Sequence, residues 1–293
     1  MNRRIFCQTA AASLGGVIAR GAYSQTPNPP TSPEVALFEG KTFQGASGET
    51  MPYRLFVPKG YAAKKKYPLV IWLHGAAGRG SDNLKQITGG NLPGATVWVK
   101  AENQAKHPCL VIAPQCPENK LWVNLNNMPA NVPSSPEQIE NAASSIAPAA
   151  MENLASSAKP SEQLRLAAEL IEAMQKSWSI DARRIYVAGQ SMGGFATWAL
   201  IGEQADKFAA AVPLCSGGNV ANAPRLTRLP IWAFHGDKDP LVPAILSRRM
   251  IGEIKKAGGK PKYTELAGAG HNIGEQVFAT PELLPWVFAQ RGR

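Results

Sequence analysis

The chain has 293 residues, of which 44% are hydrophobic and 18% are charged. This length and composition fit one large globular domain and exclude the collagen-like, coiled-coil and wholly disordered classes. Lysine and arginine number 31 against 21 aspartates and glutamates, so the formal net charge is +10. Because the basic residues are spread over short pairs and triplets without interleaved aromatic residues, they indicate a solvated surface, and no nucleic-acid partner is expected.

The first 34 residues have the pattern of an export signal followed by a leader. Arg3 and Arg4 precede a short apolar run, which is typical of a twin-arginine signal and is too short to anchor the chain in a bilayer. We predict a signal at 1–24, a flexible leader at 25–34 and one folded domain at 35–293. The protein is therefore expected to be secreted or periplasmic, without stable membrane insertion.

After the leader, short β-rich runs alternate with helical patterns, which indicates an α/β fold with helices on both faces of a mostly parallel sheet. The runs at 35–43 and 51–57 predict an antiparallel hairpin. Six further apolar runs are typical of buried strands, and they lie at 68–73, 109–113, 184–188, 209–214, 230–234 and 262–266. Helical spacing predicts helices at 162–177, 193–202, 241–257 and 281–290. The expected sheet therefore has eight strands.

Residues 124–159 interrupt this alternation. The segment is rich in asparagine, proline, alanine and serine, has little periodicity, and is longer than a simple connection needs to be. Two interpretations stay open: an insertion folded over the functional site as a lid, or a surface loop.

Cysteine and histidine spacing indicates neither a disulfide framework nor a metal site. Removal of the signal would leave Cys109, Cys116 and Cys215. A strand between the first two would hold them too far apart to bridge. The histidines are scattered without paired cysteines or acids, so we expect buried, unpaired cysteines and no metal.

The sequence Gly-Gln-Ser-Met-Gly at 189–193 lies where a predicted strand runs directly into a predicted helix. So tight a turn requires glycine at Gly189 and Gly193, and it exposes the hydroxyl of Ser191 on a strained backbone. The N-terminus of the following helix favours negative charge on an attacked carbonyl oxygen. Ser191 is therefore the candidate nucleophile.

A serine nucleophile needs a base and a carboxylate that orients the base. The loop after the last strand but one supplies Asp237 and Asp239. We favour Asp239, because it immediately precedes the Pro-Leu-Val-Pro start of the next helix, and we assign Asp237 to the turn. His271, in a glycine-rich loop after the last strand, is the predicted base. His74 and His235 each precede a glycine at a strand end, where we expect hydrogen bonds to local backbone.

The loop after strand 68–73 contains small residues that let backbone N–H groups approach a substrate. We predict an oxyanion hole formed by the N–H groups of Ala76 and Met192, with Ala77 as the alternative to Ala76. Trp122 follows a strand end on the same rim and is a candidate to stack on an aromatic or sugar ring of the substrate. Polar residues of the loop are expected to brace it, namely Arg79, Asp82 and Asn83.

Four segments carry a resemblance to known proteins, at 72–75, 189–194, 235–243 and 270–271. Through them the chain, from about residue 35 to 288, resembles an α/β-hydrolase of the esterase branch. That branch includes carboxylesterase/phospholipase-like, polyhydroxybutyrate depolymerase-like and feruloyl or acetylxylan esterase-like proteins. In the similar acyl-protein thioesterase group, corresponding positions hold the roles that we assign to Ala76, Met192 and Asp239. The resemblance implies an α/β-hydrolase catalytic domain, and the segment at 124–159 departs from its compact members.

These observations together predict a serine carboxylic-ester hydrolase that works through an acyl-enzyme without a cofactor on extracellular esters, small or polymeric. Two alternatives stay open. The first is a serine peptidase resembling the catalytic domain of prolyl oligopeptidases, which share the order Ser, Asp, His, although their propeller has no counterpart before the first central strand. The second is a non-catalytic binding protein that retains the hydrolase scaffold.

Overall fold

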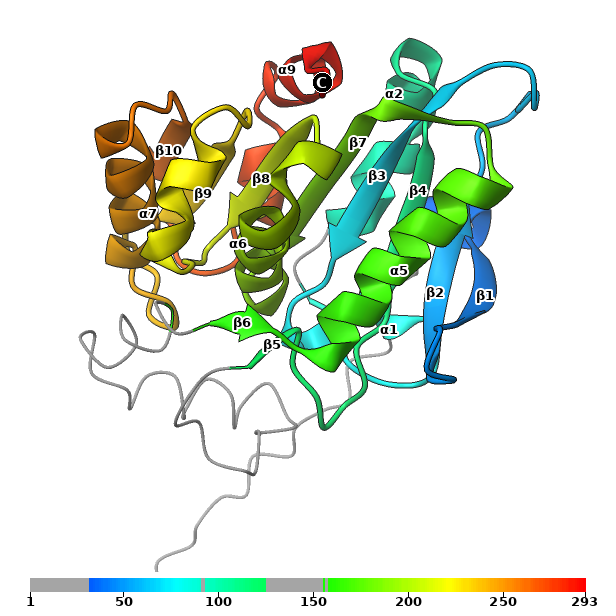
Figure 1. Cartoon of the computed structure of the whole chain (residues 1–293), viewed down its shortest axis with the longest axis horizontal. Helices are drawn as coiled ribbons and strands as arrows, with labels where there is room; N and C mark the ends of the chain where they lie inside the picture. The colour runs from blue at the N-terminus through cyan, green and yellow to red at the C-terminus, as the bar shows by residue number, and fades with distance from the viewer. Residues whose placement is uncertain (1–31, 91–92, 125–154, 156–157) are drawn as a thin grey trace, which may run out of the picture. The chain divides into compact units, whose positions relative to one another are not determined.

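An eight-stranded sheet forms the centre of the computed structural model, which describes residues 32–90, 93–124, 155 and 158–293 (Figure 1). The strand order is β1-β2-β4-β3-β7-β8-β9-β10. Strand β2 is antiparallel to β1 and β4, and every other neighbouring pair is parallel. The strands are β1 (Glu39–Gln44), β2 (Thr50–Phe56), β3 (Tyr67–Leu73), β4 (Leu110–Pro114), β7 (Ile180–Gln190), β8 (Ala210–Leu214), β9 (Trp232–Gly236) and β10 (Lys262–Leu266).

The predicted eight-stranded, mostly parallel sheet is thus confirmed. The predicted export signal, most of the leader and most of the segment at 124–159 lie outside the described residues. Residues Ser32–Arg293 form one compact unit. None of the helices in the described part of the chain is both long and apolar enough to cross a membrane.

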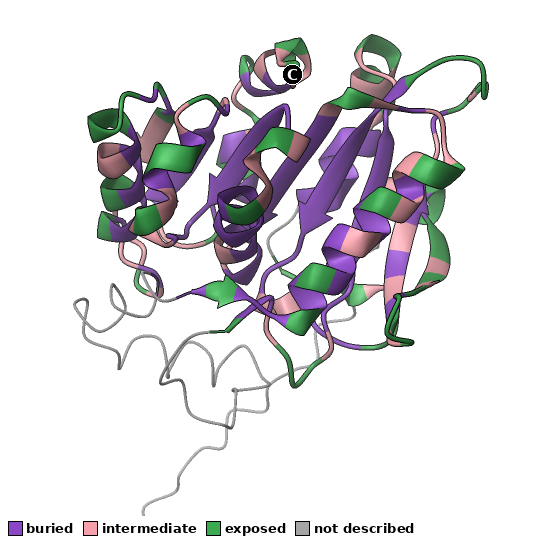
Figure 2. Ribbon diagram, in the orientation of Figure 1, coloured by how far each residue is buried: buried purple, intermediate pink, exposed green. Residues whose placement is uncertain are grey.

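Helices cover both faces of the sheet, and for this reason the central strands are apolar throughout. The ribbon of the central strands is coloured as buried along most of its length (Figure 2). Leu69 and Ile71 of β3 belong to one hydrophobic core, whereas Val70 and Trp72 belong to the other. Side chains of α5, α6 and α7 complete the first core, and the 3-10 helix η3, α8 and α9 complete the second. These elements are η3 (Gly94–Val99), α5 (Glu162–Ser177), α6 (Met192–Gln204), α7 (Ile245–Lys256), α8 (Gly274–Phe278) and α9 (Leu283–Ala289).

Local signals explain where the helices begin. Ser161 caps α5, because its hydroxyl accepts the N–H of Leu164 at 3.3 Å, and the predicted bounds 162–177 are confirmed. Helix α7 begins four residues later than predicted. The Asp239 side chain holds the N–H groups of Leu241 and Val242 in a turn, so the helix starts only after Pro243.

The structure also differs from the prediction before β2 and between β3 and β4. Strand β1 begins at Glu39 because Pro33–Leu37 forms a 3-10 helix (η1) with proline in its first turn. Between β3 and β4 the chain forms short helical pieces that the sequence did not indicate, since each is too short to show periodicity. They are η2 (Ala76–Gly78), α1 (Lys85–Thr88), η3 and α2 (Ala101–Lys106).

Two short strands bracket the segment that interrupts the α/β alternation. Strand β5 (Val123–Asn124) pairs antiparallel with β6 (Lys159–Pro160), so both ends of this segment are fixed beside the N-terminus of α5. Both open interpretations of the segment concern residues outside the described part of the chain.

The three cysteines beyond the predicted signal are free and buried. Burial raises the pKa of the Cys109 and Cys116 thiols to about 12 and also raises the pKa of Cys215. All three are therefore protonated at neutral pH, and their expected role as buried, unpaired residues is confirmed.

Candidate active site

Ser191 occupies a sharp turn between β7, which ends at Gln190, and α6, which begins at Met192. Its backbone has φ 56° and ψ −121°, in a region that non-glycine residues rarely adopt. The Ser191 N–H donates to the carbonyl of Leu214 on β8 at 3.0 Å, which holds the turn against the neighbouring strand. Strain of this kind costs about 1–3 kcal/mol and persists where the surrounding structure enforces it. The partly exposed Ser191 side chain is thereby presented above the sheet.

Close packing around the turn explains both glycines of the motif. A Cβ atom at Gly193 would lie 1.8 Å from the carbonyl oxygen of Leu73, and one at Gly189 would lie 2.3 Å from the carbonyl oxygen of Gly193. The start of α6 therefore lies directly against the ends of β3 and β7, which agrees with the tight turn that the motif predicted.

Replacing Gly193 by alanine is expected to destabilise the fold by at least about 2 kcal/mol, because the added methyl group would overlap main-chain atoms that cannot move independently. Urea unfolding followed by circular dichroism measures the change. Gly252→Ala is the matched control: this glycine lies inside α7, and no atom lies within 4 Å of the position that its added methyl group would take. Alanine there is expected to raise stability by about 0.5–1 kcal/mol. Equal stability of Gly193→Ala and wild type would contradict the packing argument.

Asp239 and His271 are joined by a hydrogen bond of 2.7 Å between Oδ2 and Nδ1. The Asp239 side chain is fully buried and that of His271 is 10% exposed. Asp239 Oδ1 accepts the N–H groups of Leu241 and Val242, each at 2.9 Å. Burial alone would raise the pKa of Asp239, but hydrogen bonds from His235, His271 and Val242 outweigh it and hold this pKa well below its usual range. An ionised Asp239 keeps the proton of His271 on Nδ1 and leaves Nε2 as the nitrogen that can accept a proton.

The loop carrying His271 is fixed at the end of β7. Gln190, the residue before Ser191, donates from Nε2 to the His271 carbonyl at 2.8 Å. The thiol of Cys215, at the end of β8, donates to the same oxygen at 3.3 Å. Because β7, β9 and β10 run parallel in the same sheet, the residues that follow their ends, Ser191, Asp239 and His271, gather at one edge. The described residues include no hydrogen bond from the Ser191 hydroxyl to His271, and such bonds often tighten only when a substrate binds.

Asp237 has a different position from Asp239. Its Oδ1 accepts the N–H of Gly268 at 2.6 Å and so braces the loop that carries His271. This bond agrees with the turn role expected for Asp237, and the contact between Asp239 and His271 favours Asp239 as the orienting carboxylate.

Three backbone N–H groups are candidates for the oxyanion hole. Met192 stands at the first position of α6, where an N–H has no partner within the helix. Ala76 and Ala77 open η2 directly after β3. None of the three N–H groups donates to another backbone group in the described turns and loops. The predicted pair, Ala76 and Met192, fits this arrangement, and Ala77 fits it as well.

Trp122, the predicted contact for a substrate ring, lies under the loop that follows β3 and exposes no face of its ring in this structure. The side chain is fully buried, its Nε1 donates to the His74 carbonyl at 3.2 Å, and its ring lies 5.2 Å from that of His74. An indole N–H in a core takes whichever acceptor is near, and for Trp122 the acceptor is the backbone at the end of β3. Trp122 therefore supports the loop from below.

A polar network holds the same loop from the side. Gln115 donates from Nε2 to the Gly78 carbonyl at 3.2 Å and to Asp82 Oδ1 at 2.8 Å, and its Oε1 accepts the N–H of Asn83 at 2.7 Å. The Arg79 Nε donates to the Ala76 carbonyl at 3.2 Å. The bracing role expected for Arg79, Asp82 and Asn83 agrees with these contacts, whereas Gln115 was not anticipated.

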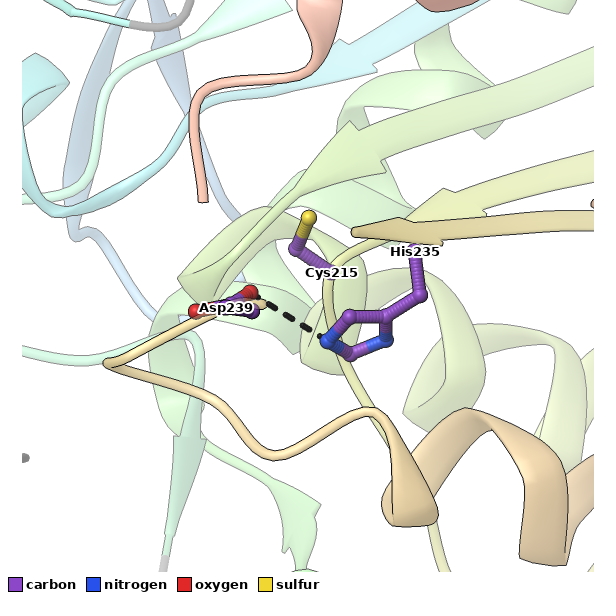
Figure 3. A group of neighbouring side chains, drawn as sticks. All are labelled: Cys215, His235 and Asp239. Atoms are coloured by element: carbon purple, nitrogen blue, oxygen red, sulfur yellow. Dashed lines mark ion pairs between the residues drawn. The ribbon is translucent and has the colours of Figure 1, made fainter. Parts of the chain in front are cut away.

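Cys215, His235 and Asp239 form a cluster whose polar atoms lie within 4.8 Å of one another (Figure 3). A metal ion would need an imidazole nitrogen without a proton and a thiolate. Both nitrogens of His235 are engaged, Nδ1 with Ser247 Oγ at 2.7 Å and Nε2 with the Val242 carbonyl at 2.8 Å. The Cys215 thiol is protonated. The cluster is therefore a hydrogen-bond network, and His235 contacts Asp239 as well as the local backbone that was expected.

The sheet order, the serine at a strand-to-helix turn and the acid and histidine on later loops define an α/β-hydrolase. Residues 61–280 match the profile of the phospholipase/carboxylesterase family, and the chain belongs to that family.

Three relatives illustrate this membership. A solved thermostable esterase is 36% identical, with a TM-score of 0.75, over 88% of this chain and 64% of its own. A bifunctional acetylxylan esterase/xylanase of Neocallimastix patriciarum is 40% identical over 76 residues, 26% of this chain and 11% of that protein. A probable feruloyl esterase C of Aspergillus terreus is 26% identical over 198 residues, 65% of this chain and 56% of that protein. The chain thus spans less than two thirds of the length of each.

Proposed function

We propose that this protein is a serine carboxylic-ester hydrolase. The observation that carries the proposal is the hydrogen bond between Asp239 and His271, held by Gln190 at the edge where the strained turn presents Ser191. Membership of the phospholipase/carboxylesterase family supports it.

The proposed reaction begins with attack of the Ser191 hydroxyl on the ester carbonyl carbon. His271 Nε2 takes the hydroxyl proton, and ionised Asp239 stabilises the imidazolium through the Nδ1 hydrogen bond. The negative charge on the carbonyl oxygen is bound by the N–H groups of Met192 and Ala76, or of Ala77 in place of Ala76. His271 then gives the proton to the departing alcohol, which leaves an acyl group on Ser191. Water, deprotonated by the same histidine, releases the acid.

Apolar side chains flank these groups. Phe195 follows Ser191 by one helical turn, Leu241 comes two residues after Asp239, and both pack partly buried against Val242 and Leu246. Such a surface suits an aliphatic acyl group or a phenolic ring. Together with the acetylxylan and feruloyl esterase relatives, it supports esters of acylated plant polysaccharide as the substrate class. Export by a twin-arginine-like signal in residues 1–24 would place the enzyme where such esters occur, in the periplasm or outside the cell.

Hydrolysis of p-nitrophenyl esters from acetate to octanoate tests the proposal, together with release of acetate and ferulate from acylated xylan. We expect activity that falls as the acyl chain lengthens. Cleavage of peptide amides without ester cleavage would replace the proposal by a peptidase. Inactivity towards all of these compounds would favour a binding protein on a hydrolase scaffold.

A further inference from the structure

His235 is a buried histidine surrounded by hydrogen-bond acceptors. It lies at the end of β9, and neither its side chain nor that of Asp239 is exposed. Its Nδ1 is 2.7 Å from Ser247 Oγ on α7. Its Nε2 is 2.8 Å from the Val242 carbonyl oxygen. The same nitrogen is 3.2 Å from Asp239 Oδ2 (Figure 3).

The proton positions follow from these partners. Ser247 Oγ lies 2.7 Å from the Ser216 carbonyl, which can only accept, so the single hydroxyl proton of Ser247 is used there. Ser247 Oγ must then accept a proton from His235 Nδ1. On the other side of the ring, Nε2 faces a carbonyl oxygen and a carboxylate oxygen, and neither can donate. Both ring nitrogens of His235 therefore need a proton.

His74 shows the opposite arrangement in the same molecule. Its Nδ1 faces the Gly75 carbonyl, an acceptor, whereas its Nε2 receives the N–H of Cys116. One proton completes these bonds, and burial lowers the pKa of His74 to about 4. Burial therefore favours a neutral histidine in this core. The hydrogen-bond partners around each ring determine whether it needs one proton or two.

Among the described acidic groups near His235, Asp239 is the anion whose charge His235 can offset. Glu265 on β10 pairs in register with His235, but its carboxylate is bound by Arg248 of α7, and this hydrogen bond is the main reason that its pKa falls to about 2. The Cys215 thiol is protonated. The remaining groups are Asp239 and His271.

We propose that His235 is a buried imidazolium that positions Asp239 and offsets part of its charge. This proposal rests on the proposed function, because it assigns His235 to the acid end of the Ser191, His271 and Asp239 triad. Asp239 Oδ2 would be held between two imidazole rings, with His271 Nδ1 at 2.7 Å and His235 Nε2 at 3.2 Å. The neighbouring cation would offset part of the negative charge of Asp239 and so weaken the attraction of Asp239 for a second proton on His271.

The protonation state is measured by NMR of protein labelled with ¹⁵N in histidine. The sequence has four histidines, and single asparagine variants assign each signal. At neutral pH we expect His235 to show two protonated ring nitrogens and His74 to show one. A neutral His235 signal would overturn the proposal. This measurement needs no hydrolysis, so it can fail while the esterase proposal stands, or hold while the esterase proposal fails.

The positioning role is tested by the pH profile of ester hydrolysis in His235→Asn. We expect kcat to fall roughly 10-fold with KM unchanged, as for loss of a hydrogen bond to a charged group. We expect the acidic limb of the profile to move to higher pH by about half a unit to one unit, because Asp239 would then hold the proton on His271 more strongly. If His235→Asn gives less folded enzyme but leaves the acidic limb of the pH profile in place, His235 has only a structural role, and this result would overturn the proposal.

Two further variants make the test decisive. His107→Asn is the control: His107 stacks on Phe288 at a ring distance of 4.5 Å, away from the cluster, and its replacement is expected to leave the limb in place. Ser247→Ala removes only the acceptor of Nδ1 and leaves the His235 ring. We expect it to lose the Nδ1 proton signal and to move the limb in the same direction as His235→Asn. If His235→Asn does not fold, the Ser247→Ala variant provides the test. An unchanged His235 Nδ1 proton signal and an unchanged acidic limb in that variant would overturn the proposal.

Discussion

Replacing Ser191 by alanine is expected to lower kcat/KM for p-nitrophenyl acetate by about 10⁴- to 10⁶-fold, while the fold is retained. The reason is that no other described hydroxyl stands on the strand-to-helix turn at the edge where Asp239 and His271 meet. The residual rate would come from the oxyanion N–H groups, which the substitution leaves in place. Initial rates with matched protein concentrations, checked by circular dichroism, measure the effect.

Ser47→Ala is the matched control for this experiment. Ser47 is exposed in the turn between β1 and β2, where its hydroxyl contacts Glu49, and we expect wild-type activity. A fluorophosphonate probe should add its mass to wild type and Ser47→Ala but not to Ser191→Ala. Undiminished hydrolysis by Ser191→Ala would disprove the nucleophile, and with it the acyl-enzyme.

Most of the fold could be predicted because its determinants are local. A run such as Leu69 to Leu73 is apolar at every position only when both faces of a strand are covered, so the buried strands could be recognised one by one. The bounds of α5 followed from helical spacing, and the cap at Ser161 agrees with its first residue. The pieces between β3 and β4 could not be predicted, since helices of three to six residues depend on tertiary packing rather than on a pattern of their own.

The candidate site also combines residues that local motifs reveal with residues whose positions depend on contacts distant in sequence. Ser191 and His271 could be proposed as candidates because each follows a predicted strand inside a short motif. The buried position of Trp122 could not be predicted, because its partner, the His74 carbonyl, is 48 residues away in sequence. The bond from Gln190 to His271 spans 81 residues. The sequence places residues at one edge of the sheet, but it does not show which of them turn inward to support the others.

Asp239→Asn is expected to lower kcat/KM by about 10⁴-fold while nearly preserving side-chain volume. Asp239 Oδ1 already accepts the N–H groups of Leu241 and Val242, so the amide oxygen of asparagine would occupy that position and the NH₂ group would face His271. An NH₂ donor requires His271 Nδ1 to be without a proton, which moves the proton to Nε2. In that tautomer His271 cannot accept the proton of Ser191, although every residue of the site is still near its original place.

Asp237→Asn separates this tautomer effect from a general loss of charge. Asp237 uses one oxygen to accept the N–H of Gly268, and the asparagine oxygen can accept the same bond. Activity is therefore expected to stay within about threefold of wild type, since only a charge-assisted bond becomes a neutral one. Histidine NMR of both variants completes the comparison: the proton of His271 should be on Nε2 in Asp239→Asn and on Nδ1 in Asp237→Asn. A large loss in Asp237→Asn with wild-type activity in Asp239→Asn would reverse the assignment of the two aspartates.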